Sequence, residues 1–234
     1  DADWHFKVNG KNDFIEMMKW FDDPKLGGIL ESYPVEWNED EVKKNKSMAY
    51  LGISWTSYFW IDYLKKYHSV RIGNDLYADS DNNNFPFELN IMRRKLYRKN
   101  DTLGDAWERA LDVLEQGFTL RLVEDPNLPR MIASYKIARF RDLIKQKKRT
   151  AISRDQLIKK YPYVKFGASD FYLPLLIFTI IGMRKVKRPL AIAGVFIRLL
   201  IMGSSMFLHK LKRTEKGTYE SWVLRAKRIE HVKT

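Results

Sequence analysis

The chain of 234 residues contains no cysteine. Disulfide bonds, thiolate metal sites and cysteine nucleophiles are therefore excluded. The four histidines, His5, His68, His209 and His231, are isolated from one another, and neither HExxH nor a similar metal-ligand spacing occurs. The sequence consequently predicts no metal site and no cofactor.

Motifs that mark common enzyme classes are also missing. The sequence has neither a GxxxxGK[ST] nor a GxGxxG phosphate-binding loop. Its nearest approach to a GxSxG nucleophile elbow begins at Gly52 with Ser54 in the serine position, and the second glycine is absent because Thr56 occupies its place. Carboxylates are numerous in the first half, but no pair stands out as an acid–base couple. We therefore expect a protein that is not an enzyme.

Positive charge is abundant and unevenly distributed, with a formal net charge of +13. Residues 1–100 hold 15 Lys and Arg against 16 Asp and Glu, a net of −1, whereas residues 151–234 hold 17 against 5, a net of +12. The basic excess thus accompanies the most apolar part of the chain. This coupling favours anionic phospholipid such as cardiolipin, or an acidic protein surface, as the partner.

Two apolar segments, 166–183 and 189–208, follow each other near the C-terminus. As helices rising 1.5 Å per residue they would reach about 27 and 30 Å, close to the hydrocarbon thickness of a bilayer. Neither segment has the polar face that a surface helix normally shows. The sequence therefore predicts a two-helix transmembrane hairpin over 166–208. Its turn is basic and consists of Arg184, Lys185, Val186, Lys187 and Arg188.

Aromatic residues agree with this interpretation. A cluster at the start of the first segment resembles an aromatic belt at a membrane interface, and it comprises Tyr161, Tyr163, Phe166, Phe171 and Tyr172. Residues 48–64 are also rich in aromatic side chains and are flanked by lysines. Because Ser54, Thr56 and Asp62 reduce its hydropathy, we expect a core or interfacial helix there, with a third membrane helix as the alternative.

Arg198 lies near the middle of the second apolar segment. A lone arginine at that depth costs about 2.5–3.5 kcal/mol on insertion scales, so it requires a partner. The two segments contain no acidic residue except Asp170, so we expect another subunit or a lipid to supply that partner. The candidate residues for contact with lipid or subunits are Arg198, Arg184, Lys185, Lys187, Arg188, Lys210, Lys212 and Arg213.

The rest of the sequence predicts helices and loops, so the expected fold class is mainly α. A short helix should follow Asn12, a second should cover 103–116 and a third 130–149, and a loop should cover 27–37. The chain then divides into four parts. These are a mixed-charge soluble or peripheral region at 1–100, basic amphipathic helices at 101–165, the hairpin at 166–208 and a basic C-terminal helix at 209–234.

In layout the chain resembles the accessory subunits of mitochondrial inner-membrane complexes, those of the respiratory chain and of ATP synthase. The features that carry the resemblance are a start at Asp1 without Met, which would fit removal of a targeting segment, the absence of cysteine, the apolar hairpin and its basic turn. The resemblance implies a non-catalytic subunit in the mitochondrial inner membrane that binds no cofactor, stabilises core subunits and holds lipid.

Two other functions fit parts of the sequence. The basic segment 130–165, with its interleaved Tyr and Phe residues, would suit an RNA-binding protein of the ribosomal type. The apolar hairpin would also suit a membrane enzyme that acts on lipids, although no catalytic motif supports that function. Nucleic acid is the less expected partner, because the hairpin has no role in binding it.

Overall fold

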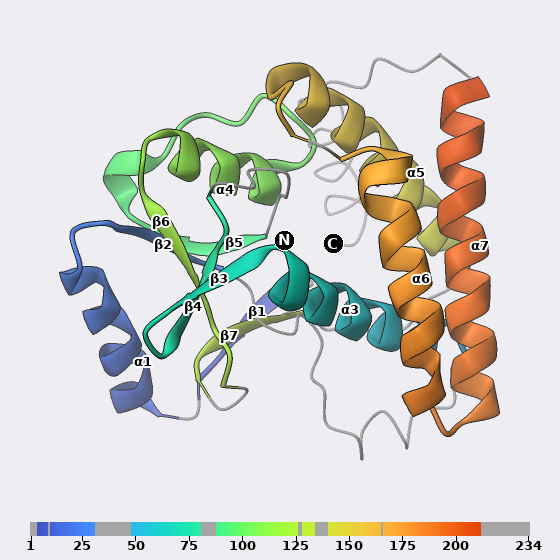
Figure 1. The fold of residues 1–234 in the computed structure, drawn as a ribbon, viewed down its shortest axis with the longest axis horizontal. Helices are drawn as coiled ribbons and strands as arrows, with labels where there is room; N and C mark the ends of the chain where they lie inside the picture. Colours follow the sequence, from blue (N-terminus) through green and yellow to red (C-terminus); the bar gives the residue numbers. More distant parts are fainter. Residues whose placement is uncertain are drawn as a thin grey trace, which may run out of the picture.

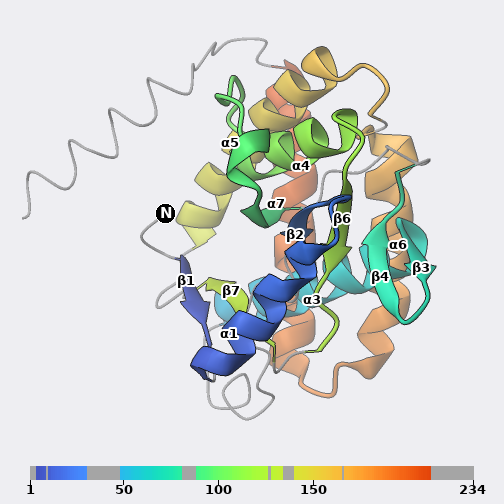
Figure 2. The same cartoon turned by 90° about the vertical axis from the view of Figure 1, so that its left-hand side faces the viewer.

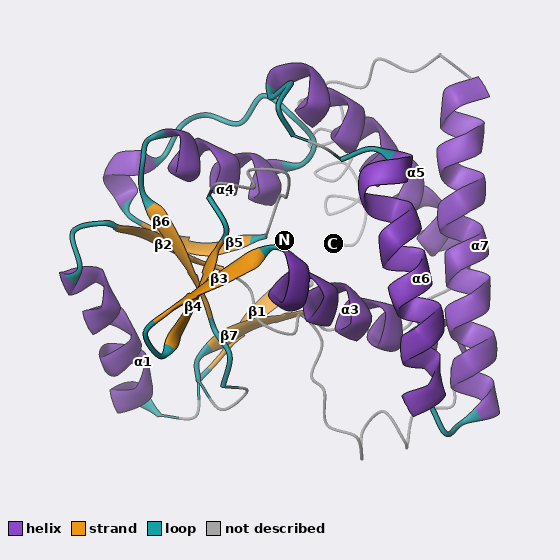
Figure 3. Ribbon diagram, in the orientation of Figure 1, coloured by secondary structure: helices purple, strands orange, loops and turns teal. Residues whose placement is uncertain are grey.

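The computed structural model describes residues 4–8, 10–30, 48–80, 88–125, 128–133, 140–164 and 166–211. Figures 1 and 3 show their helices and strands. The α-helices are α1 (Lys11–Met18), α3 (Met48–Tyr67), α4 (Asp105–Glu115), α5 (Phe140–Lys160), α6 (Leu173–Gly182) and α7 (Pro189–Leu211). The strands are β1 (Trp4–Lys7), β2 (Leu26–Leu30), β3 (Ser69–Ile72), β4 (Asp75–Ala78), β5 (Leu89–Met92), β6 (Thr119–Leu122) and β7 (Arg130–Ala133). Short helical turns are η1 (Lys19–Asp22), η2 (Arg94–Leu96), η3 (Ala168–Tyr172) and η4 (Met183–Lys185).

The predicted fold class is wrong, because the protein is mixed α/β rather than mainly α. A five-stranded mixed sheet lies beside the helices, and none of the helices in the described ranges has both the length and the apolar character needed to cross a membrane. The strands are difficult to predict from the sequence because each has only four or five residues. Strand β2 is buried at every position, so it lacks the alternation that reveals a half-buried strand, and it overlaps the expected loop at 27–37.

The sheet has the order β3-β4-β6-β2-β5. Strand β2 pairs in parallel with β6 and antiparallel with β5, so it has a hydrogen-bonded strand on each side. Its glycines allow this close packing: a Cβ on Gly28 would lie 2.8 Å from the carbonyl oxygen of Ile91, and one on Gly27 would collide with Val113 of α4. Strands β1 and β7 form a separate antiparallel pair.

Different helices cover the two faces of the sheet. On one face, Leu30, Leu120 and Leu122 belong to a large apolar core with residues of α3, α4 and α6. On the other face, Ile29 packs with Met17 of α1, in a smaller cluster that η1 completes. In Figure 2 helix α1 lies in front of the sheet, on the side away from α6 and α7. The sheet is therefore covered on both faces.

Helix α3 contains the aromatic segment 48–64 and is a core helix. Its Ile61 and Leu64 are buried in the large apolar core, while Leu51 and Phe59 are buried against α7 and the turn before it. The backbones of α3 and α7 cross at Gly52 and Gly194, where a Cβ on either glycine would collide with backbone atoms of the other helix. Small residues permit so close an approach.

The other helix predictions have mixed outcomes. Helix α4 confirms the predicted helix at 103–116 to within two residues, and Gly117 adopts the left-handed φ of 79° expected of a C-terminal glycine. Helix α1 confirms the start of the short helix after Asn12 to within two residues, and it ends at Met18, where the turn η1 follows. The helix predicted at 130–149 is wrong at its start, because residues 130–133 form β7 and helix α5 begins at Phe140.

Candidate functional site

The first half of the predicted hairpin is divided between the core and a short helix. Phe166 and Phe171 are completely buried in the large apolar core, together with Tyr161, so they form no membrane belt. Residues Ala168–Tyr172 make a π-helical turn rather than an α-helix. The continuous α-helix α6 therefore has only 10 residues, about 15 Å in length. That length is the physical reason why this segment does not form half of a transmembrane hairpin.

Helix α6 is apolar on both sides. Its inner side carries Leu175 and Thr179, which are buried, and Gly182, where a Cβ would lie 2.6 Å from the ring of Phe59. Its outer side should be polar if water alone surrounded it. Instead, that side carries aliphatic side chains that are between 47% and 57% exposed: Leu173, Ile177, Ile180 and Ile181.

Helix α7 repeats this arrangement. Ala191 and Val195 are completely buried on its inner side, whereas Phe196 is 48% and Leu200 69% exposed. Helices α6 and α7 are antiparallel, and both extend from the turn that joins them (Figure 1). In the sequence, Ile177 and Phe196 lie at similar distances from the turn, as do Leu173 and Leu200. We call Leu173, Ile177, Phe196 and Leu200 the outer residues of the hairpin.

The basic turn lies at the end of the hairpin. Arg184, Lys185 and Lys187 are exposed, and among the described residues none of their side chains forms an ion pair. Arg188 is half-buried. Met183 and Val186 of the same turn are buried against Phe59 and α7, which fixes the turn to the core. We call the exposed residues around it the hairpin tip, which consists of Ile180, Ile181, Arg184, Lys185, Lys187 and Leu190.

The other basic residues selected from the sequence lie elsewhere. Arg198 is only 8% exposed and lies on α7, which packs on α5. Burial lowers the pKa of Lys147 on α5 to about 7, the charge of the nearby Arg198 contributes to this decrease, and Glu88 opposes both effects. Arg198 is thus separate from the exposed basic residues. The side chain of Lys210, together with Lys212 and Arg213, lies outside the described residues.

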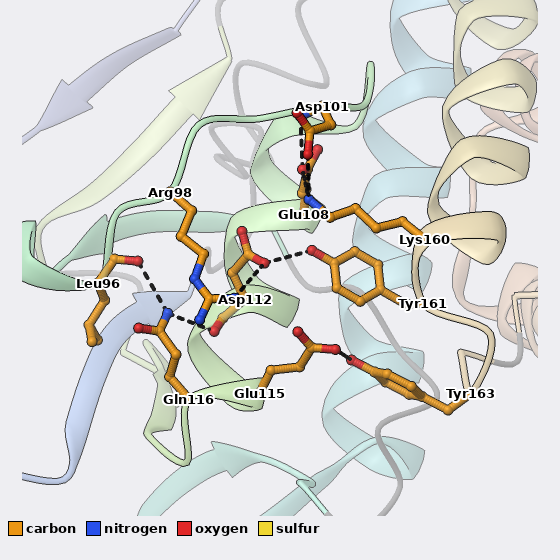
Figure 4. Close-up of polar contacts among 10 residues, drawn as sticks. All are labelled: Leu96, Arg98, Asp101, Glu108, Asp112, Glu115, Gln116, Lys160, Tyr161 and Tyr163. Carbon is orange, nitrogen blue, oxygen red and sulfur yellow. Dashed lines mark hydrogen bonds and ion pairs between the residues drawn. The ribbon is translucent and has the colours of Figure 1, made fainter.

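A second group of unusual residues joins α4 to the end of α5 (Figure 4). Glu108 of α4 is completely buried and accepts hydrogen bonds from the backbone N–H groups of Asp101 (2.9 Å) and Thr102 (2.8 Å). The Nζ of Lys160 donates to Glu108 at 2.6 Å and to Asp101 at 3.0 Å. Three donors therefore surround one buried carboxylate.

Two tyrosines extend this group, which we call the α4–α5 polar cluster. The hydroxyl of Tyr161 donates to the buried Asp112 at 2.7 Å, and that of Tyr163 donates to Glu115 at 2.8 Å. The three carboxylates that α4 contributes to the cluster, at 108, 112 and 115, follow the i, i+4, i+7 spacing of one helix face. In the sequence, this spacing and the nearby Lys160, Tyr161 and Tyr163 are the signals that could indicate the cluster. They do not show that the two segments meet, because the segments lie about 50 residues apart in the chain.

The protonation states of the cluster suit a structural contact. Burial alone would raise the pKa of Glu108, but hydrogen bonds from Lys160, Asp101 and Thr102 outweigh it and leave the pKa below its ordinary value. Burial and the hydrogen bond to Asp112 raise the pKa of Tyr161 well above the ordinary value, and Tyr163 is affected in the same way by burial and Glu115. The carboxylate of Glu108 is therefore ionised and both tyrosines are protonated donors near neutral pH. A catalytic acid or base would need a pKa close to the working pH.

Within the residues that the structure describes, no group of three His, Asp or Glu side chains could hold a metal ion. No protein-family model, curated protein or solved structure matches the chain. What the protein does must therefore be inferred from its own side chains and surfaces, and the hairpin is the part that departs most from an ordinary surface.

Proposed function

We propose that the protein is a non-catalytic accessory subunit of a multi-subunit assembly at a membrane, and that its outer residues dock on an apolar surface of a neighbouring subunit. The observation that carries this proposal is the aliphatic outer side of α6, which lies opposite a completely packed inner side. Helices that are apolar all round normally have both sides covered. The centre of a protein interface has this composition, since it is apolar and poor in charge.

The location of the assembly is proposed from the resemblance in sequence layout. The mitochondrial inner membrane, with a respiratory-chain complex or ATP synthase, is the location implied by the resemblance to accessory subunits. In this proposal the protein stabilises core subunits and takes no part in the chemistry.

The test compares two sets of four serine substitutions in the full chain. The first set changes the outer residues Leu173, Ile177, Phe196 and Leu200. The matched control set changes four exposed aliphatic residues outside the hairpin, Ile15, Val70, Ile72 and Ile144. After extraction in mild detergent, native electrophoresis and native mass spectrometry measure the share of the protein in a large assembly of fixed stoichiometry.

We expect the first set to reduce that share at least tenfold and the control set to leave it unchanged. Thermal denaturation of both purified variants verifies that they remain folded. Equal loss of assembly in the two sets, or migration of the unaltered protein as a monomer, would refute the docking proposal.

The two alternative functions have no described contact in their favour. Tyr161 is buried, so its ring is not presented like the stacking platforms of single-strand RNA-binding proteins, and the 40% exposed Tyr163 donates its hydroxyl to Glu115. For a lipid-acting enzyme, the buried carboxylates of the α4–α5 polar cluster are engaged with donors of the same chain. RNA that co-purifies in detergent at high salt would nevertheless favour the first alternative.

A further inference from the structure

The hairpin tip combines aliphatic and cationic side chains at one end of the molecule. Leu173, Ile177 and Ile180 follow the i, i+4, i+7 spacing along α6, and this row leads to Arg184 in the turn. Lys185 and Lys187 follow within the turn, and Leu190 is exposed in the first turn of α7. Aliphatic residues therefore lie directly beside three exposed positive charges.

No acidic residue balances these charges in the neighbouring sequence. Between Asp170 and Glu215 the chain contains no Asp or Glu at all. Within the described ranges, Arg184, Lys185 and Lys187 also form no ion pair with a residue from another element. The tip consequently presents a positive potential that an anionic surface would neutralise.

The composition of the tip distinguishes between possible anionic partners. Single-stranded nucleic acid is bound through aromatic rings on which bases stack, and the tip contains no aromatic residue. Interfaces between proteins are depleted in lysine. Aliphatic side chains bordered by Lys and Arg are typical of segments that lie at the boundary between headgroups and acyl chains.

The tip is also held in place before any partner binds. Met183 and Val186 are buried in the cluster formed with Phe59, and the backbone N–H of Val186 donates to the carbonyl of Met183 at 2.9 Å. Since the turn is already fixed to the core, binding would cost little conformational entropy.

We propose that the hairpin tip inserts into the headgroup layer of an anionic bilayer, with Ile180, Ile181 and Leu190 reaching the acyl boundary and Arg184, Lys185 and Lys187 contacting phosphate groups. The tip enters only the interface and does not cross the membrane. This inference deepens the proposed function by naming the lipid that the same hairpin contacts, while the outer residues farther from the turn bind the neighbouring subunit.

The charge contribution is tested by flotation of the full chain with vesicles of phosphatidylcholine, with and without phosphatidylglycerol. The variant Arg184→Gln/Lys185→Gln/Lys187→Gln is compared with Arg94→Gln/Lys99→Gln/Lys159→Gln, which removes one Arg and two Lys from exposed positions elsewhere. We expect the tip variant to lose roughly a hundredfold in affinity for the anionic vesicles, and the control to retain most of its affinity. Equal losses in the two variants, or equal binding to neutral vesicles, would overturn the proposal.

Insertion of the aliphatic residues is tested with a fluorescent probe. Because the chain has no cysteine, Ile181→Cys supplies a unique thiol for an environment-sensitive label, and Ile72→Cys supplies the control on the exposed strand β3. We expect anionic vesicles to shift the emission to the blue at position 181 and to leave position 72 unchanged. An unchanged emission spectrum at position 181 would rule out insertion. A blue shift at 181 in the absence of vesicles would also rule it out, because it would show that two copies of the chain associate through the tip.

The two proposals can fail independently, because the vesicles contain no other subunit. Loss of vesicle binding with intact native assembly removes only the lipid inference. Vesicle binding by a protein that never enters an assembly removes only the proposed docking to a subunit.

Discussion

In the α4–α5 polar cluster, charged side chains lie inside the protein, whereas in the hairpin aliphatic side chains lie outside it. Glu108 and Asp112 are buried, yet each receives donors from the same chain. Leu200 is 69% exposed and Ile181 57% exposed, and both lie on helices whose inner sides are already packed. The comparison separates a polar contact made within the chain, which serves the fold, from a surface that suits an external partner.

The largest effect on stability is expected at Glu108. Replacing it with alanine leaves two backbone N–H groups without their acceptor and removes the buried one of the two acceptors of Lys160, so Glu108→Ala should lower the free energy of unfolding by about 3–5 kcal/mol. Glu115→Ala removes a more exposed carboxylate of the same helix and should cost less than about 1 kcal/mol. Urea denaturation measures both variants, and similar losses would contradict the distinction between them.

The crossing of α3 and α7 provides a second comparison, within one helix. Gly194→Ala places a methyl group against the backbone of α3 and should cost about 2–3 kcal/mol. Gly203→Ala meets no atom within 4 Å and should stabilise the helix by about 0.5–1 kcal/mol. The changes in melting temperature should therefore have opposite signs; a stabilised Gly194→Ala would show that the helices do not cross as closely as described.

Lys147 of α5 lies near Arg198 of α7, and its titration should make stability depend on pH. Its pKa falls from 10.5 to about 7 in the folded protein, because of burial and the neighbouring Arg198. Between these values the unfolded chain binds a proton that the folded protein does not, so stability should rise with pH. We expect a gain of up to about 2 kcal/mol from pH 7 to pH 9.

The variant Lys147→Met keeps the length of the side chain and cannot titrate. Urea denaturation at several pH values should therefore give a flatter profile for Lys147→Met than for the unaltered protein. Parallel profiles would mean that Lys147 remains protonated in the folded state.

Removing a tyrosine hydroxyl from the polar cluster should have a smaller effect on stability, which depends on whether the acceptor is buried. Tyr161→Phe removes the donor to the buried Asp112, whose Oδ2 has no hydrogen-bond partner among the described residues, and should cost about 1–2 kcal/mol. Tyr163→Phe removes the corresponding donor to the exposed Glu115 and should cost less than about 1 kcal/mol. Thermal unfolding measures both variants. A larger loss of stability for Tyr163→Phe than for Tyr161→Phe would contradict the conclusion that the Tyr161 contact is the buried one.

The smallest effect on stability is expected on the outer side of the hairpin. Leu200→Gln should change the free energy of unfolding by no more than about 0.5 kcal/mol, since the side chain is mostly exposed. Val195→Ala on the inner side should cost about 1–3 kcal/mol, because it leaves a cavity against α3. A large loss for Leu200→Gln in the isolated protein would mean that this residue serves the fold rather than a partner.

Local signals in the sequence were sufficient for some elements. The left-handed glycine at 117 ends α4, and the apolar repeat before it marks the helix, since both depend only on neighbouring residues. The basic turn was also evident, because the charged run 184–188 interrupts two apolar segments and is followed by Pro189. The burial of Arg198 was not evident, because it depends on α5, whose Lys147 lies about 50 residues earlier in the chain.

By itself, the sequence determined where apolar and basic residues concentrate, the absence of thiol chemistry and the positions of α1 and α4. Only the tertiary structure decided that the segment 166–183 contributes Phe166 and Phe171 to a core shared with the sheet, and that α6 is short with an exposed outer side. The physical reason is that hydropathy measures how strongly a side chain avoids water, whereas the burial of that side chain depends on residues that are distant in the sequence. The same apolar residues can therefore fill a core, as Phe171 does, or remain outside for a partner, as we propose for Ile177.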